Sequence, residues 1–233
     1  MITARYIAHS GDDLMVVNAA RVSFHKESGW GDREYMPEDD TWQITRGPQT
    51  LKASDAKLIC YLADHNHWTP FAHPQITLQL SAPVFVRTQC FKHKVGFVEN
   101  EVSRRYVDDD PDFYAPEVWR YRAENKKQGS AGPLTGSAHE AAEACYDSLL
   151  DEAIKAYGNL LELGVAPEQA RMVLPQSMIT EWYWTGSLAA YARFYRDRTK
   201  PDAQAETGLA AKACGDIIAP LFPVAWVALT AGV

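Results

Sequence analysis

The sequence predicts a single α+β domain in which several helices pack around a small mixed or antiparallel sheet. Segments with apolar residues at helical spacing occur beside short segments in which apolar and polar residues alternate. The chain has neither a β-α-β alternation nor a GxGxxG fingerprint, so a parallel dinucleotide-binding sheet is not expected. Its 233 residues, 46% of them hydrophobic and 23% charged, suffice for a well-filled core. We therefore expect residues 1–233 to form one domain.

The N-terminal part is expected to supply a strand, a helix and a long loop. Thr3–Ala8 is predicted to be a short strand. Apolar residues at helical spacing predict a helix over Asp12–Phe24, with Asp12 or Asp13 as its cap. Residues Glu27–Pro48 are polar and rich in Gly, Asp and Trp. Such a composition, over about residues 25–50, predicts a long loop that serves as a lid or an insertion.

A helix, a strand and a second helix are expected next. Ser54–Ala63 is predicted to be a helix capped by Ser54. Gln75–Leu80, QITLQL, alternates as a half-buried strand does. Pro83 suits the first turn of a helix that continues through PVFVRTQCFKHK.

The C-terminal half is expected to be mostly helical after a second long loop. Asp108–Gly136 is rich in proline and glycine and is predicted to be irregular, with a mobile tip near Lys126–Gly132. A long helix is predicted from Ser137 to Gly164. The remaining predicted elements are a short helix over Glu168–Leu174, a strand over Met178–Trp184, a helix over Ser187–Arg196 and a helix over Gln204–Leu229 that breaks near Pro220 and Pro223.

Charge, hydropathy and cysteine usage exclude several classes of protein. The net charge of −7 argues against a nucleic-acid partner. No apolar run reaches the roughly 18 residues that span a bilayer, and the first residues lack a signal-peptide core. The four cysteines are scattered without a CxxC pair, which favours a reduced cytoplasm. His65, His67 and His73 lack a supporting carboxylate or cysteine, so no metal site is predicted.

The most informative segment is Gln89–Tyr106, QCFKHKVGFVENEVSRRY. Basic runs are commonly solvated faces, but an apolar stretch directly before this one indicates a partly buried element. The paired arginines offer forked donors that match phosphate or carboxylate. The segment therefore predicts a site for an anion such as a nucleotide. Its candidate residues are Lys92, His93, Lys94, Glu99, Glu101, Ser103, Arg104 and Arg105.

Later arginines are candidates for the same site. Arg171 precedes MVLP on a short, partly buried helix, although a surface position is an equal alternative. Arg193, Arg196 and Arg198 lie among aromatic residues in YARFYRDR, and three arginines exceed what compensation of a helix end requires. Cys90 could be a nucleophile activated by cationic neighbours, but we favour a small buried side chain.

Five motifs in chain order resemble those of the flavin-dependent thymidylate synthases, the ThyX family. The family's basic signature is RHR, followed at a fixed spacing by a serine. The corresponding basic triplet here is KHK, Lys92–Lys94. The eight residues between this triplet and Ser103 are one more than in the family. The matching stretches are NAARVSF at Asn18–Phe24, HWTPFAH at His67–His73, KHK with Ser103 and the ending ENEVSRRY, ARMVLP at Ala170–Pro175 with Thr180 and Trp184-Thr185, and Arg198 with Ala203-Gln204 and Glu206.

The resemblance implies a methyltransferase reaction. Such an enzyme methylates dUMP at C5 of the uracil ring to give dTMP, with methylenetetrahydrofolate as the carbon donor. Reduced FAD supplies the hydride, and NADPH reduces the flavin. The resemblance also implies a homotetramer with active sites where subunits meet. No cysteine nucleophile is needed, which agrees with a buried Cys90.

Residue roles follow from the same resemblance. Arg198 matches the arginine at the N3/O4 edge of uracil, where a guanidinium would stabilise negative charge on the ring, so it is the expected catalytic residue. The residues expected to bind dUMP are Gln89, Lys92, Glu101, Ser103, Arg104, Arg105, Arg171 and Arg198. Those expected to bind FAD are Thr69, Lys92, His93, Lys94, Glu101, Ser187, Ala189 and Arg193.

Several positions depart from the family pattern. Lysine keeps the charge of arginine but loses its fork. The departures are Lys92 and Lys94 for arginines, Ala72 for glutamate, Ser187 and Ala189 for asparagine and arginine, and Asp202 for histidine. We therefore expect other residues to help hold FAD, among them Trp30, Trp42 or the long loops. The alternatives are a nucleotide- or flavin-binding protein of the same fold without synthase activity and, as a weaker one, a nucleic-acid-binding module.

Overall fold

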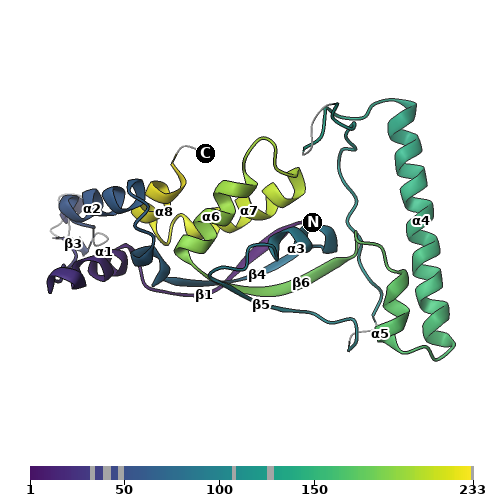
Figure 1. Ribbon diagram of the computed structural model, residues 1–233, viewed down its shortest axis with the longest axis horizontal. Coiled ribbons are helices and arrows are strands. Elements are labelled where there is room, and N and C mark those ends of the chain that lie inside the picture. Colours follow the sequence, from purple (N-terminus) through teal and green to yellow (C-terminus); the bar gives the residue numbers. More distant parts are fainter. Residues whose placement is uncertain (32–34, 39–42, 47–49, 107–108, 125–128, 232–233) are drawn as a thin grey trace.

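A four-stranded antiparallel sheet forms the centre of the computed structural model, which describes residues 1–31, 35–38, 43–46, 50–106, 109–124 and 129–231 (Figure 1). Its strand order is β1-β4-β6-β5, so strands distant in the sequence are neighbours. The strands are β1 (Thr3–Ser10), β4 (Gln75–Pro83), β5 (Phe97–Glu101) and β6 (Ile179–Ser187). This sheet and its helices confirm the predicted α+β class.

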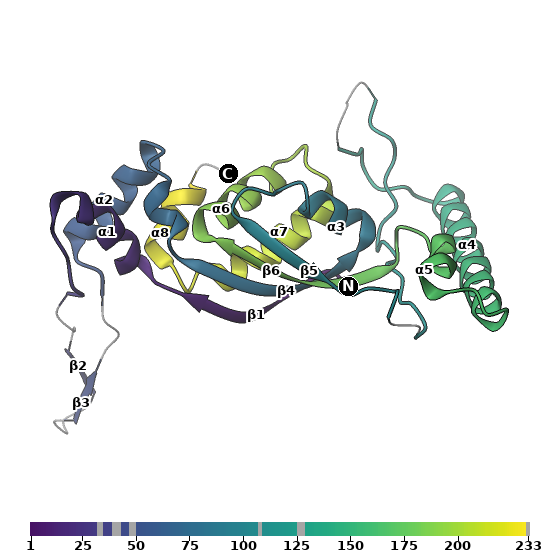
Figure 2. The same cartoon turned by 60° about the horizontal axis from the view of Figure 1, so that its bottom comes forward.

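Helices cover one face of this sheet, and the core lies between the two layers. Figure 2 shows α3 (Val84–Cys90), α6 (Leu188–Arg198) and α7 (Ala205–Ile218) along that face. Alternation decides which side chains face them: Ile76, Leu78 and Leu80 of β4 are fully buried, whereas the residues between them are partly exposed. The opposite face carries exposed residues such as Arg5 and Tyr183.

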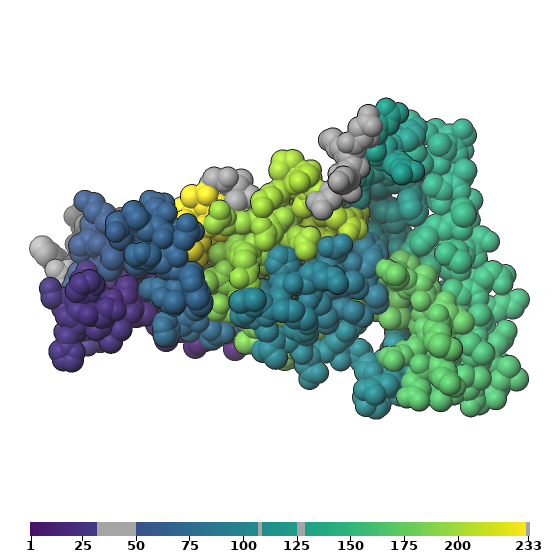
Figure 3. Space-filling view, viewed as in Figure 1, coloured from purple at the N-terminus to yellow at the C-terminus, as the bar shows by residue number. Residues whose placement is uncertain are grey.

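Two groups of helices flank the sheet at opposite ends. Near one end lie α1 (Asp13–Arg21), α2 (Ala53–Asp64) and α8 (Pro223–Thr230). The long α4 (Ser137–Glu162) and the short α5 (Pro167–Ala170) form a separate column at the other end (Figure 3). Among the described residues, no helix combines the length and apolarity required to cross a membrane.

The structure shows the N-terminal caps of α1 and α2, for which the sequence predicted Asp12 or Asp13 and Ser54. A carboxylate oxygen of Asp12 accepts a hydrogen bond from the Met15 N–H at 2.9 Å, which confirms Asp12 as the cap of α1. The predicted cap at Ser54 is wrong, because α2 begins at Ala53 and its N-cap is Lys52. There the backbone carbonyl of Lys52 accepts the first hydrogen bonds of the helix, and Ser54 lies in the first turn.

The first long loop differs from the prediction in part, whereas the described residues of the second are irregular, as predicted. The first contains a two-stranded antiparallel sheet, β2 (Tyr35–Glu38) and β3 (Gln43–Arg46), which the sequence interpretation as a loop missed. In the second, the described residues outside α4 form no helix or strand longer than an isolated bridge. Trp42 and much of the predicted tip, residues 125–128, lie outside the described residues.

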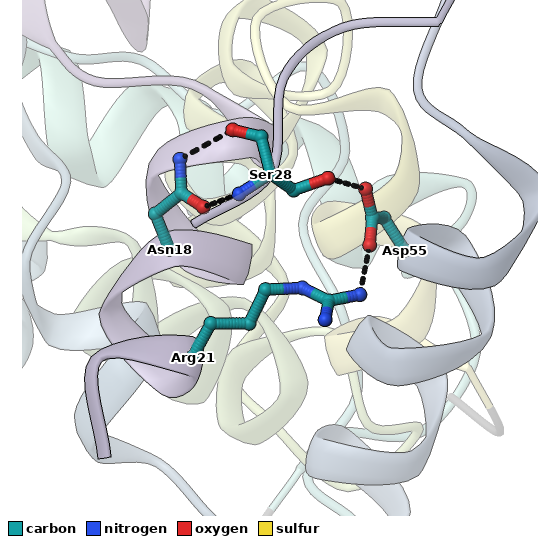
Figure 4. Close-up of polar contacts among 4 residues, drawn as sticks. All are labelled: Asn18, Arg21, Ser28 and Asp55. Carbon is teal, nitrogen blue, oxygen red and sulfur yellow. Dashed lines mark hydrogen bonds and ion pairs between the residues drawn. The ribbon is translucent and has the colours of Figure 1, made fainter. Parts of the chain in front are cut away.

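A buried polar network joins the first loop to α1 and α2 (Figure 4). Asp55 is fully buried, and its carboxylate accepts from the Arg21 guanidinium at 2.5 Å and from the Ser28 hydroxyl at 2.5 Å. Asn18 bonds both the N–H and the carbonyl of Ser28. Burial would raise the pKa of Asp55, but the Ser28 and Arg21 contacts outweigh it and hold that pKa below its usual value. Asn18 and Arg21 of the NAARVSF motif therefore fix the root of the loop.

The other boundaries shift at positions that matter for the site. Pro83 closes β4 and caps α3 instead of entering it, and α3 ends at Cys90 instead of continuing through the basic triplet. Strand β5 was not predicted at all. The 3₁₀ helices Val22–Phe24, Thr69–Ala72 and Arg171–Val173 complete the chain's regular structure among the described residues. The expected break before α8 is confirmed.

Candidate active site

The larger of the two described cavities has a volume of about 1180 Å³, and we name it the α6 cavity. Its walls come from the end of α2, the 3₁₀ helix Thr69–Ala72, the start of β5, α6 and the end of α8. Three residues predicted to bind FAD, Ser187, Ala189 and Arg193, line it. Thr69 itself is not among the lining residues, although Trp68 and Phe71 of the same motif are.

Close packing fixes the wall between β5 and α6. Ser187 caps α6 by accepting from the Ala190 N–H at 3.2 Å. Gly96 sits against this cap with a φ of +84°, and a Cβ there would lie 2.9 Å from the Ala190 Cβ. The Arg193 guanidinium donates to the backbone carbonyl of Val95. Since only glycine fits both the conformation and the space, the turn after the basic triplet is held rigidly on α6.

The α6 cavity has aromatic and charged side chains in its lining. Trp68 is 62% exposed and Phe97 is partly buried. Arg196 and Lys200 contribute positive charge, but Asp197 also lines the cavity and pairs with Lys200 at 3.0 Å. Aromatic planes stack on ring systems, and cations pair with phosphate.

The basic triplet lies beside this cavity and not in its lining. Lys94 pairs with Glu99, and its ammonium lies 5.1 Å from the centre of the Phe91 ring. Lys92 is exposed. His93 is half-buried against Phe194 of α6, with ring centres 5.1 Å apart in an edge-to-face arrangement. The three members of the triplet therefore have different environments, which the sequence does not reveal.

Arg198, the expected catalytic residue, contacts two residues near the end of α3. Its Nε donates to Nε2 of His93 at 2.9 Å, and a terminal nitrogen donates to the Gln89 carbonyl at 3.4 Å. Burial lowers the pKa of His93 to about 4, and the charge of Arg198 acts in the same direction. The structure thus brings together Gln89, His93 and Arg198.

The second cavity, of about 530 Å³, is rich in arginine, and we name it the arginine cavity. It contains five of the predicted dUMP residues, whereas Lys92 lines neither cavity. The five come from the end of β5, the chain after it and the helical segment after α5, and they are Glu101, Ser103, Arg104, Arg105 and Arg171.

Internal contacts already engage several side chains of the arginine cavity. Glu101 accepts from Arg87 at 2.9 Å and from the Thr180 hydroxyl at 2.9 Å. Arg104 pairs with Asp109 at 2.8 Å, and Arg171 donates to the Glu168 carbonyl at 3.2 Å. These contacts orient the arginines around the cavity.

Sequence reasoning missed Arg87. It lines the arginine cavity and forms an ion pair with Glu101, yet its only sequence signal is a charge within the apolar stretch before the basic segment. Its partner lies 14 residues away, on a strand that was not predicted.

Neither a cysteine nucleophile nor a metal centre emerges. Cys90 is fully buried, and burial raises the pKa of its thiol to about 12, so a thiolate is strongly disfavoured. This agrees with the prediction that Cys90 is a small buried side chain. No group of three or more potential metal ligands gathers anywhere in the described part of the chain.

The fold places two cavities with basic side chains in their linings beside an antiparallel sheet. A profile of the family described as "Thymidylate synthase complementing protein" matches residues 5–224, and the chain belongs to this family, also called ThyX. It is 38% identical over 224 residues to a flavin-dependent thymidylate synthase of Thermus thermophilus, covering 96% of this chain and 74% of that one.

Two further comparisons agree in family and fold. The flavin-dependent thymidylate synthase of Thermosipho africanus is 35% identical over 202 residues, covering 87% of this chain and 79% of that one. The solved structure of PolB, a UMP/dUMP methylase from Streptomyces cacaoi bound with 5-Br UMP, superposes with a TM-score of 0.80 at 27% identity, covering 99% of this chain and 94% of that chain.

Proposed function

We propose that this protein is a flavin-dependent thymidylate synthase. The one-carbon unit of methylenetetrahydrofolate would be transferred to C5 of dUMP with loss of the C5 proton. Bound FAD, once reduced by NADPH, would supply the hydride that completes the methyl group, so that the products are dTMP, tetrahydrofolate and oxidised FAD.

The observation that carries this proposal is that three of the eight residues predicted to bind FAD line one cavity. Ser187, Ala189 and Arg193 lie on the wall of the α6 cavity, and Arg198 ends the same helix. The other five predicted residues lie outside this lining, and they are Thr69, Lys92, His93, Lys94 and Glu101.

The residues of the α6 cavity fit FAD. Its volume of about 1180 Å³ exceeds the roughly 300–1,000 Å³ of ordinary ligand pockets, as a dinucleotide requires. Trp68 and Phe97 offer aromatic surface, and Arg196 offers charge for a diphosphate, while Lys200 pairs with Asp197 at 3.0 Å. Arg196 is our candidate to replace the family arginine that is absent at Ala189. When bound and reduced, the flavin supplies the hydride.

Arg198 is assigned the catalytic role toward the pyrimidine. A guanidinium at the N3/O4 edge of uracil stabilises negative charge on the ring and so makes C5 more nucleophilic. Its contacts with His93 and Gln89 hold it in place before the substrate arrives. Arg105 and Arg171 of the arginine cavity are assigned to the phosphate.

The proposed assembly is a homotetramer in which neighbouring copies complete each site. The predicted dUMP residues fall into two groups on one chain, one around Arg198 and one in the arginine cavity. One face of the sheet carries exposed side chains, including Tyr183 at 46% exposure. Packing a second copy against the first would cover such surfaces and join the two groups.

The test follows tritium release from dUMP labelled at C5, in the presence of methylenetetrahydrofolate, FAD and NADPH. Release is expected with dUMP, and UMP is assayed beside it because the similar PolB structures carry analogues of both nucleotides. The purified protein should also be yellow and bleach with NADPH. No release from FAD-loaded, reduced protein would refute the synthase and favour the alternative, a binding protein of the same fold. The departures at Lys92, Lys94 and Ala189 favour testing that alternative.

A further inference from the structure

The catalytic arginine has its own partner, which comes from the basic triplet. Arg198 and His93 are 105 residues apart in the sequence, yet Nε of the guanidinium lies 2.9 Å from Nε2 of the imidazole. A guanidinium has no acceptor, so the N–H of Arg198 donates and His93 accepts. The imidazole must therefore be neutral, with Nε2 unprotonated and the proton on Nδ1.

The surroundings of His93 hold the ring in this position. Its backbone N–H donates to the Cys90 carbonyl at 3.0 Å at the end of α3. Its ring meets Phe194 edge to face at 80°, and Phe194 is fully buried one turn before Arg198 on α6. The histidine thus lies between α3 and α6 and contacts both Phe194 and Arg198.

The electrostatics keep the imidazole in its accepting form. The charged groups that act on it are Arg198 and Arg193, which oppose protonation, and Asp197, which favours it. Burial and the arginines outweigh Asp197, so the pKa of His93 falls to about 4. At neutral pH the acceptor is therefore present in nearly every molecule.

The two contacts of Arg198 use only part of its donor capacity. A guanidinium carries five N–H donors, of which one goes to His93 and one to the Gln89 carbonyl. Contacts at both Nε and a terminal nitrogen restrict the guanidinium to one orientation. Its remaining N–H donors then point in fixed directions and are available to a ligand.

We propose that His93 is a positioning residue that sets the orientation of the Arg198 guanidinium. This inference deepens the proposed function and depends on the catalytic role of Arg198. It differs from the FAD-binding role that the family resemblance implies, because the partner seen here is the arginine.

The test compares His93→Phe, which keeps a ring against Phe194 but has no acceptor, with His93→Gln, whose amide oxygen can accept. His93→Phe should lower kcat by roughly tenfold to a hundredfold and weaken dUMP binding roughly tenfold, with the bound FAD little changed. His93→Gln should recover kcat to within about threefold of wild type. His9→Phe on β1, where the exposed histidine contacts Tyr6, is the matched control.

A double-mutant cycle separates positioning from a direct role. dUMP affinity is measured by calorimetry for His93→Phe, Arg198→Ala and the double variant. If His93 acts through Arg198, the double variant binds dUMP no more weakly than Arg198→Ala within about twofold. Additive losses, a loss of FAD in His93→Phe, or no rescue by His93→Gln would overturn the proposal.

The same variants distinguish failure of the inference from failure of the proposed function. If wild type releases no tritium, the synthase assignment fails, while the dUMP-binding cycle still decides whether the two residues are coupled. If wild type does not bind dUMP either, the crystal structure of His93→Phe shows whether His93 positions Arg198. A displaced Arg198 guanidinium would support positioning, and an unchanged one would overturn it.

Discussion

The two cavities are built in different ways. The walls of the α6 cavity belong to regular elements that are fixed by the Ser187 cap and by the close approach of Gly96 to α6. The arginine cavity is lined in part by α3, β5 and β6, but also by the irregular chain after β5 and by the turn after α5, where Met172 is 78% exposed. We infer that the proposed flavin site depends mainly on regular elements, whereas the proposed nucleotide site depends more on irregular chain.

The largest effect is expected at Arg198, which ends α6 and is not among the lining residues of either cavity. Arg198→Ala should keep the fold and the bound FAD and lower turnover by roughly a thousandfold, since it removes a donor aimed at developing charge. Tritium release and flavin absorbance measure the two effects. Arg198→Lys, which retains the charge but not the fork, should fall between wild type and Arg198→Ala. Wild-type turnover in Arg198→Ala would remove it from the mechanism.

The next largest effect is expected from a substitution in the arginine cavity. Arg171→Ala should raise the KM for dUMP roughly tenfold to a hundredfold, because a charge-assisted bond to phosphate contributes about 1.5–3 kcal/mol. FAD binding to the α6 cavity should not change. Arg122→Ala, an exposed arginine of the second loop, is the control. If Arg171→Ala loses FAD as well, the two cavities are not separate sites.

The α6 cavity has its own structural test. Gly96→Ala should lower the free energy of unfolding by about 1–3 kcal/mol and weaken FAD binding, because the added methyl group meets Ala190 and the φ of +84° disfavours alanine. Urea denaturation and flavin titration measure both quantities. Gly132→Ala offers a control, since a Cβ there has open space around it. Equal behaviour of the two variants would contradict a rigid wall.

Acid should weaken the contact between His93 and Arg198. The pKa of His93 is lowered from 6.5 to about 4 in the folded protein, so the unfolded chain binds more protons between these values. Stability from this group is therefore complete above about pH 6.5 and declines as the pH falls toward about 4. Urea denaturation between about pH 7 and about pH 5 should show a smaller acid loss for His93→Phe than for wild type. Identical slopes would place the acid sensitivity elsewhere.

The smallest effect is expected at the exposed start of the basic triplet. Lys92→Arg should leave FAD affinity unchanged or slightly tighter, because arginine keeps the charge and adds a fork. Flavin titration measures it. A large loss of FAD affinity would show that the lysine has a role specific to this chain.

Local patterns predicted most of the framework. The alternation in QITLQL predicted β4, and Asp12 predicted the start of α1. Strand β5 escaped because FVENE has few apolar residues and is stabilised by pairing with β6, a contact distant in sequence. The same reason hid Arg87, whose partner Glu101 lies on β5, and the contact of His93 with Arg198. Family motifs could indicate which residues belong to a site, but only the fold shows which of them touch.

The most direct test of the proposed function is tritium release from C5-labelled dUMP by the wild-type protein, loaded with FAD and supplied with methylenetetrahydrofolate and NADPH. We predict release that depends on all three additions and that is nearly abolished by Arg198→Ala. Absence of release from protein that binds both reduced FAD and dUMP would contradict the proposed synthase activity.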